Sequence, residues 1–123
     1  MSKFVIRRVP SGIKFDLKAG NGETVASSEV YTSGAACRRG IASVRKNAPA
    51  AAVEDRTCEK GKKESCPKFE VFQDQRGQFR FRLRSTNGKI IAVSEGYTTK
   101  ESCLGGVESV RRNALCAEIS EDQ

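Results

Sequence analysis

The sequence predicts an α+β fold in which one domain is built from two tandem β-β-β-α-β repeats. Residues 13–48 match residues 79–114 at a constant offset of 66, with sixteen of 36 positions identical. Within each copy, segments that alternate apolar and polar residues precede a segment of helical periodicity. A 123-residue chain suits one domain, and a single copy would be only marginally stable alone. We therefore expect the two copies to share one core.

The repeats divide the chain into three segments. The first repeat covers about residues 1–53 and the second covers residues 67–123. Residues 54–66 between them are polar and balanced in charge, which indicates a flexible linker. The two repeats are expected to form one pseudo-symmetric domain, a mostly antiparallel sheet of eight short strands with two helices on one face.

Three strands are predicted at the start of the first repeat, over residues 3–8, 13–18 and 23–28. The second of these alternates apolar and polar residues, which is typical of a half-buried strand. Asn21 and Gly22 form a strong hairpin signal, and we expect a type I′ turn because both residues tolerate positive φ.

A helix is predicted for residues 33–47, followed by a short strand over residues 50–53. One face of this helix is an apolar stripe made of Cys37, Gly40, Ile41, Val44 and Ala48. In the second copy, Thr98 and Glu101 have the spacing of a capping box at the helix start. The glycines on the stripe, Gly40 and its equivalent Gly106, are expected to let each helix approach the sheet closely.

The chain contains no histidine, which excludes Cys-His nucleophiles, Ser-His triads and mixed Cys/His zinc sites. It has five cysteines and no signal-peptide pattern, so reduced cytosolic thiols are expected. We expect Cys37 and Cys103 to be buried, whereas a redox role for Cys58, Cys66 or Cys116 is an open alternative. No catalytic residue, metal ligand or cofactor is indicated.

Three arginines alternate along one predicted strand, at Arg80, Arg82 and Arg84. Alternation places them on the face opposite the strand's apolar residues, about 6.8 Å apart, where they could bind the phosphates of a polyanion. The favoured interpretation is a solvated face whose arginines pair with carboxylates on neighbouring strands. The net charge of +7 is compatible with either role, and residues 1–53 alone contribute +6.

Glu29 and Glu95 occupy equivalent positions at the corner between the third strand and the helix of each copy. The favoured interpretation is a structural salt bridge or hydrogen bond to the neighbouring copy, and the alternative is contact with a partner. Tyr31 and Tyr97 are expected to pack beneath the same corners.

Phe79 to Tyr97 and the Val110 to Ala114 segment resemble the YegP-like family, also called UPF0339 or the DUF1508 domain. The first copy matches this pattern in part, with Lys14 and Asp16 at positions where arginines are usual. The resemblance implies two β3-α-β units in one sheet with their last strands exchanged between the units. It implies no activity.

These observations favour a non-enzymatic cytoplasmic interaction or accessory protein with an unidentified protein partner. The alternatives are weak binding of nucleic acid or another polyanion through cationic sheet and helix surfaces, and a thiol-based redox role. We expect a monomer that acts as a pseudo-dimer and has no membrane association.

Overall fold

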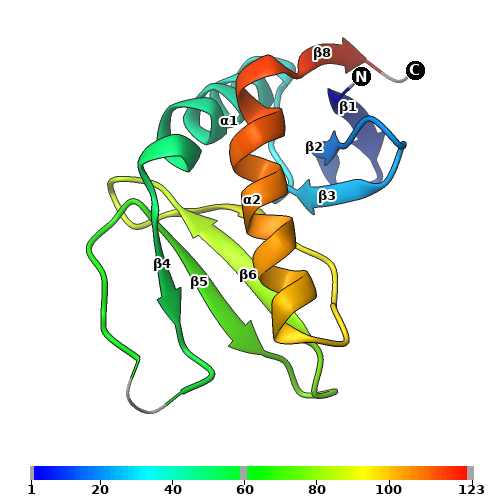
Figure 1. Ribbon diagram of the computed structural model, residues 1–123. Coiled ribbons are helices and arrows are strands. Elements are labelled where there is room, and N and C mark those ends of the chain that lie inside the picture. Colours follow the sequence, from blue (N-terminus) through cyan, green and yellow to red (C-terminus); the bar gives the residue numbers. More distant parts are fainter. Residues whose placement is uncertain (1, 59–60, 122–123) are drawn as a thin grey trace.

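The computed structural model describes residues 2–58 and 61–121, and it has two helices and one eight-stranded sheet in these residues (Figure 1). The elements are β1 Lys3–Val9, β2 Gly12–Lys18, β3 Thr24–Ser27, α1 Gly34–Asn47, the short 3₁₀ helix η1 Ala48–Ala50, β4 Ala52–Asp55, β5 Lys68–Gln73, β6 Phe79–Arg84, β7 Ile90–Val93, α2 Lys100–Cys116 and β8 Glu118–Glu121. The predicted α+β class is confirmed.

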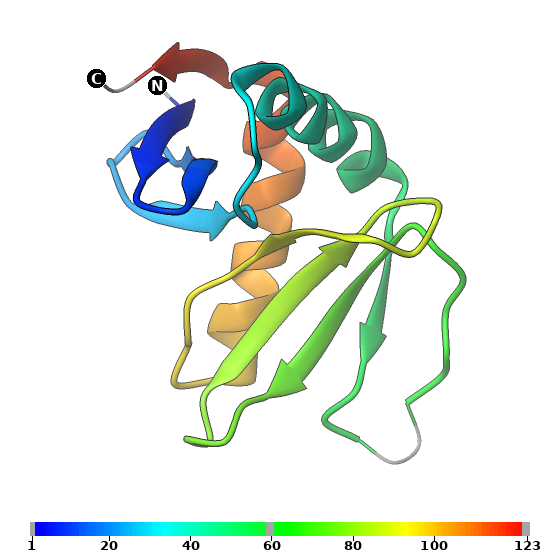
Figure 2. The same cartoon turned by 180° about the vertical axis from the view of Figure 1, so that it is seen from behind.

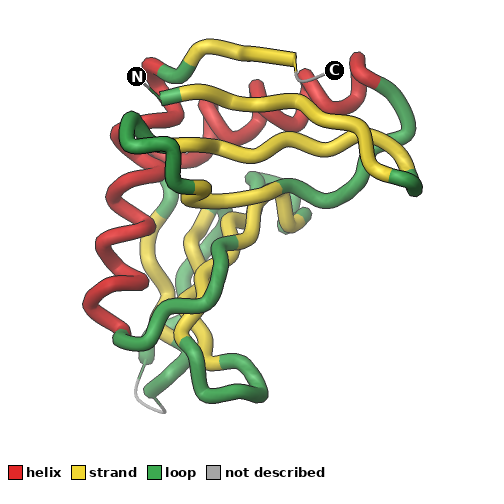
Figure 3. The backbone as a smooth tube through the Cα atoms, turned by 90° about the vertical axis from the view of Figure 1, so that its right-hand side faces the viewer, coloured by secondary structure: helices red, strands yellow, loops and turns green. Residues whose placement is uncertain are grey.

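The strands lie in the order β4-β5-β6-β7-β3-β2-β1-β8. Strands β1 to β3 and β5 to β7 pair antiparallel, while β4 pairs parallel with β5 and β8 pairs parallel with β1. Strands β3 and β7 join the two halves at the register pair Ser27–Val93. Figure 3 shows that the sheet bends sharply between its halves.

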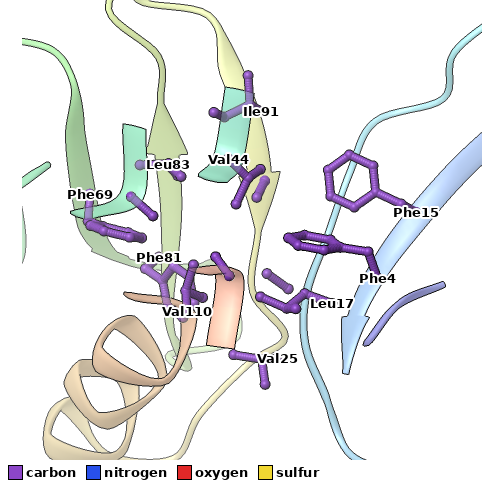
Figure 4. Packing of buried hydrophobic residues seen from close by; sticks show 14 of the residues in the cluster. Phe4, Phe15, Leu17, Val25, Val44, Phe69, Phe81, Leu83, Ile91 and Val110 are labelled. Carbon is purple, nitrogen blue, oxygen red and sulfur yellow. The ribbon is translucent and has the colours of Figure 1, made fainter. Parts of the chain in front are cut away.

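The core is a single cluster of buried side chains from the sheet and both helices (Figure 4). Two aromatic pairs form its centre. The rings of Phe4 and Phe15 meet edge to face at 5.6 Å, and those of Phe69 and Phe81 meet at 5.8 Å. All four rings are at most 1% exposed, so the core spans both halves of the chain.

The hairpin turns differ from the predicted type I′ form. The Gly22 N–H donates to the Ala19 carbonyl, and the Ala19 N–H donates to the Glu23 carbonyl, both at 2.9 Å. Gly22 has φ +84°, whereas no described non-glycine residue has positive φ, so Asn21 does not. A three-residue loop of this kind needs positive φ only at its last residue. The type I′ expectation is therefore wrong.

The helix cap of the second copy lies one residue beyond the predicted Thr98. Thr99 is the N-cap of α2, and its hydroxyl accepts a hydrogen bond from the Ser102 N–H at 3.1 Å. Tyr97 still pairs with Phe79 through two backbone hydrogen bonds of 2.8 Å. Because this pairing holds the chain extended, the helix begins later, and the capping box of Thr98 with Glu101 is wrong.

The segment predicted as a linker is ordered at its start. Strand β4 continues through Glu54 and Asp55, which lie in register with Glu70 and Val71 of β5. The Glu54 carboxylate is buried and accepts a hydrogen bond from Lys68 Nζ at 3.0 Å. The strand predicted over residues 50–53 therefore lies two residues later, and residues 59–60 of the expected linker lie outside the described residues.

Candidate functional site

Ser94 and its equivalent Ser28 stabilise the corner that follows each third strand. Ser94 Oγ accepts a hydrogen bond from the Phe81 N–H at 2.9 Å and donates to the Glu95 carbonyl at 2.8 Å. Ser28 makes the same two contacts in the first half, with Phe15 and Glu29. Both serines are buried, and each hydroxyl satisfies backbone groups that would otherwise lack a partner. These hydrogen bonds explain why both halves of the chain have a serine at this position.

Arg45 and Arg111 link each helix to the strand supplied by the other half. Arg111 Nη2 donates to the Ala51 carbonyl at 2.7 Å, directly before β4. Arg45 Nη2 donates to the Ala117 carbonyl, directly before β8. The guanidinium of Arg111 also lies over the Phe69 ring, 5.5 Å from its centroid. The sequence does not predict these contacts, because no local pattern shows a partner 60 or more positions away.

Gly40 and Gly106 are the points where each helix meets a tyrosine. A Cβ on Gly106 would clash with the Tyr97 hydroxyl and would lie 2.9 Å from Cε2 of Phe81. A Cβ on Gly40 would clash with the Tyr31 hydroxyl in the same way. The predicted close approach of helix to sheet is confirmed, and both tyrosines pack against the core beneath their corners.

The three arginines of β6 all pair with carboxylates on the outer face of the sheet. Arg80 Nε lies 2.8 Å from Asp74 Oδ2, while Arg82 Nε and Arg84 Nε each lie 2.6 Å from Glu70 Oε1. Each of these arginine side chains is about one-quarter to one-third exposed, whereas the Glu70 side chain is 2% exposed. Arg82 and Arg84 thus pair with a carboxylate of the neighbouring strand β5, as in the favoured interpretation, whereas Asp74 lies in the turn that follows β5.

Glu70 is the centre of this ion-pair cluster. Burial on its own would raise the pKa of Glu70, but the hydrogen bonds from Arg82 and Arg84 outweigh burial and lower that pKa to about 2. Arg56 Nη1 also lies 2.9 Å from Glu70 Oε2, and Lys68 Nζ lies 3.4 Å from the same oxygen. Glu70 is therefore ionised at neutral pH and holds four cations in place.

The corner glutamates lie in different surroundings. Glu29 Oε1 lies 3.4 Å from Lys89 Nζ, which belongs to the turn between β6 and β7 of the other half. Glu95 is exposed. At the position equivalent to Lys89 stands Glu23, and the negative charges of Glu95 and Glu23 both raise the pKa of Tyr97, after burial and the Cys103 thiol. The two corners thus have the same backbone hydrogen bonds but differ in charge.

A groove lies between α1 and the turn joining β6 to β7. Figure 2 shows this turn beside the end of α1. Two adjoining hollows form the groove and share Arg39, Ser43, Ser85 and Asn87. The remaining lining residues are Tyr31, Ala36, Gly40, Ala42, Lys46, Asn47, Thr86, Lys89 and Ile91. Both halves of the chain therefore contribute to this site.

The groove is rich in unpaired positive charge. Arg39 and Lys46 are exposed and have no ion pair among residues 2–58 and 61–121. By contrast, the neighbouring Arg38 pairs with Glu121 at 2.6 Å. The sequence predicted cationic helix surfaces but did not single out Arg39 or Lys46. The charge of +6 in residues 1–53 was the available indication that this helix carries unpaired positive charge.

The cysteines are all free thiols. Cys37 and Cys103 are fully buried, as predicted, and burial raises the pKa of Cys103 to about 11. Cys58 and Cys116 are exposed, and Cys66 is partly buried. In the part of the chain that the structure describes, no group of three or more potential ligands could hold a metal ion. No described helix has the length and apolar character needed to cross a membrane.

The fold and the groove define a small α+β protein that has no recognisable catalytic constellation among its described residues. The sequence model of the "Domain of unknown function (DUF1508)" matches residues 12–55 and 74–121. The chain is also 38% identical to the "UPF0339 protein YegP" of Escherichia coli O157:H7 over 112 residues, which are 91% of this chain and 88% of that protein. The chain therefore belongs to the DUF1508 (UPF0339) family.

Solved structures agree with this assignment. The solution structure of yegP from E. coli, a protein of unknown function, covers 98% of this chain with a TM-score of 0.80 and 33% identity. The match spans 92% of that chain. A UPF0339 protein from Shewanella oneidensis gives a TM-score of 0.78 at 26% identity, over 98% of this chain and 90% of its own.

Some relatives match less than half of this chain. The UPF0339 protein of Methanosarcina acetivorans is 56% identical over 52 residues, which are 42% of this chain and 90% of that protein. The family thus includes proteins about half as long as this one. Relatives of either length are described as proteins of uncharacterised function, which agrees with the absence of an implied activity.

Proposed function

We propose that this protein is a non-enzymatic binding protein that contacts its partner through the groove between α1 and the β6–β7 turn. The observation that carries the proposal is the contrast between two sets of polar residues. Ser28, Ser94, Arg45 and Arg111 are occupied by backbone contacts, so they are not free for chemistry. The groove, in contrast, exposes charged side chains without ion pairs.

Affinity capture from the source cell tests this function. The intact protein is compared with an Arg39→Glu/Lys46→Glu variant, and both captured proteins and captured nucleic acids are identified. The expected result is a saturable ligand that the intact protein retains and the variant loses. A ligand retained equally by both proteins, or a small molecule consumed by the intact protein, would contradict the proposal.

Polyanion binding on the outer sheet face is a second candidate. The cluster formed by Arg56, Lys68, Arg82 and Arg84 has four positive charges against two negative ones from Glu54 and Glu70. This excess favours an anion near the partly exposed arginines. Replacing Arg80, Arg82 and Arg84 with alanine should then abolish oligonucleotide binding at low salt. Unchanged binding would exclude this face.

We also propose that the two halves are tandem repeats that exchange their last strands. The parallel pairs β4–β5 and β8–β1 support this, because each joins the end of one half to the first strand of the other. Cutting the chain near residue 60 should therefore give fragments that fold only when mixed. Two stable, separate monomers would refute the exchange. Separately, we propose that the intact chain is a monomer and that it is cytoplasmic.

A further inference from the structure

We propose that the groove between α1 and the β6–β7 turn is a binding site for phosphate groups. The inference rests on the proposed binding function and specifies its ligand. Free phosphate esters and the backbone of a nucleic acid present the same anionic oxygens, so both are possible sources of the bound group.

The first argument is that the unpaired positive charge of the groove lies on α1. Arg39 and Lys46 lie seven residues apart on one face of α1, which separates them by about 10 Å along the helix axis. Lys89 lines the same groove from the opposite wall, where Glu29 pairs with it at 3.4 Å. The groove therefore has two unpaired cations on one wall and one paired cation on the other.

The second argument concerns hydrogen bonding. Asn87 Oδ1 accepts from Ser85 Oγ and from the Lys89 N–H, which leaves the Nδ2 donors of Asn87 without a partner in the described residues. Asn47 Oδ1 accepts from Thr86 Oγ1 at 2.9 Å, and Asn47 Nδ2 donates to Ser43 Oγ at 3.1 Å. Because these side-chain acceptors are already occupied, the groove offers mainly donors. A donor-rich cationic surface is suited to phosphate.

The third argument is that the two halves of the chain differ in charge at the groove positions. The offset of 66 assigns each groove residue an equivalent in the other half. Gly105 stands at the position equivalent to Arg39, Glu108 at that of Ala42, and Glu23 at that of Lys89. Of the three groove cations, only Lys46 has a basic equivalent, Arg112. The positive charge of the groove is therefore not repeated at the equivalent positions of the other half.

Backbone amide NMR titration at low salt tests the proposal. The probes are inorganic phosphate and a single-stranded deoxyoligonucleotide, added separately to the intact protein. Two variants are compared with it: Arg39→Ala/Lys46→Ala in the groove, and Arg112→Ala at the exposed equivalent position. An unchanged amide spectrum away from the substitution shows that each variant is folded.

At least one probe should shift the amides of residues 39–47 and 85–89 in the intact protein. The Arg39→Ala/Lys46→Ala variant should bind that probe at least tenfold more weakly, and Arg112→Ala should bind it within twofold of the intact protein. If only the oligonucleotide binds, the source is a nucleic-acid backbone. Its log–log salt dependence should then have a slope of about −1.4, since the two unpaired cations contribute about −0.7 each.

Three results would overturn the phosphate site: no shift with either probe, equal binding by the groove variant, or an equal loss in Arg112→Ala. The last would indicate attraction by net charge alone. If phosphate fails while cellular capture still depends on Arg39 and Lys46, the groove is a binding site for a different ligand. If capture is independent of both residues, the proposed function itself fails.

Discussion

Arg111 of α2 donates a hydrogen bond of 2.7 Å to the carbonyl of Ala51, sixty positions earlier in the chain. The contact fixes the start of β4 against the second half, and Arg45 with Ala117 provides the equivalent contact for β8. We predict that Arg111→Met lowers the free energy of unfolding by about 2 kcal/mol, since the variant leaves a backbone acceptor without its charged donor. Urea unfolding followed by circular dichroism measures this loss.

The neighbouring Arg112 is the matched control for this prediction. It is exposed and has no ion pair among the described residues, so Arg112→Met should change stability by less than about 0.5 kcal/mol. Equal effects of the two substitutions would show that the Ala51 contact does not stabilise the fold.

Gly105 and Gly106 should respond in opposite directions to alanine. Alanine favours a helix by about 1 kcal/mol over glycine, and nothing lies within 4 Å of a Cβ at Gly105. At Gly106, the added methyl group meets the Tyr97 hydroxyl and Phe81, so we expect a net loss of about 1–3 kcal/mol. Thermal unfolding of both variants measures the difference.

A second substitution separates steric clash from other causes. Removing the hydroxyl with Tyr97→Phe should recover part of the stability lost in Gly106→Ala, because the remaining ring carbon is still 2.9 Å from the added Cβ. No recovery in the double variant would mean that the tyrosine is not the obstacle.

Ser94→Ala should cost about 1–3 kcal/mol, because the buried Phe81 N–H loses the hydroxyl that accepts its hydrogen bond. The serine side chain is small, so lost packing adds little to this cost. Hydrogen exchange should show faster exchange at the Phe81 amide. Ser102→Ala on the exposed start of α2 serves as the control. An unchanged Phe81 amide in Ser94→Ala would be inconsistent with the proposed role.

Glu70 should make stability depend on acid pH. Its pKa is about 2 in the folded protein and near 4.5 when the chain is unfolded, so the unfolded state takes up the proton more readily. The stabilisation, up to about 3 kcal/mol, is therefore complete above about pH 5 and is lost as pH falls toward 2. Glu70→Gln should destabilise the protein at pH 7. It should also reduce, by up to about one, the number of protons that the chain takes up on unfolding in acid, which sets the slope of the free energy of unfolding against pH.

The unaltered protein provides the reference for the pH measurement. Equal slopes for Glu70→Gln and the unaltered protein, measured by urea unfolding from pH 2 to 7, would exclude Glu70 as the main source of acid sensitivity.

The sequence predicted the strands, both helices and the packing glycines because periodicity and turn residues are local signals. It misplaced the cap at Thr98, since the backbone pairing of Tyr97 with Phe79 is a contact between strands. It ended the fourth strand at residue 53, whereas β4 continues to Asp55 through its pairing with β5. Where a tertiary contact fixes the position at which a helix or strand begins or ends, the local sequence does not predict that position.

The candidate site was less predictable than the fold. The arginines of β6 could be assigned to one face, but Glu70, the shared partner of Arg82 and Arg84, depends on the register between β5 and β6. The groove at Arg39 and Lys46 depends on how α1 lies beside a turn about forty residues later. Charge counts showed which half is basic, whereas only the assembled chain shows which basic residues stay unpaired.

The parallel pairing of β1 with β8 also sets an order of events during synthesis. Lys3–Val9 leaves the ribosome well before its neighbour Glu118–Glu121, because the rest of the sheet lies between them in the sequence. Until β8 has been made, β1 therefore has an open edge that other chains could pair with. A chain that stops before residue 118 would leave that edge open permanently, so truncation before β8 should expose the protein to aggregation or proteolysis.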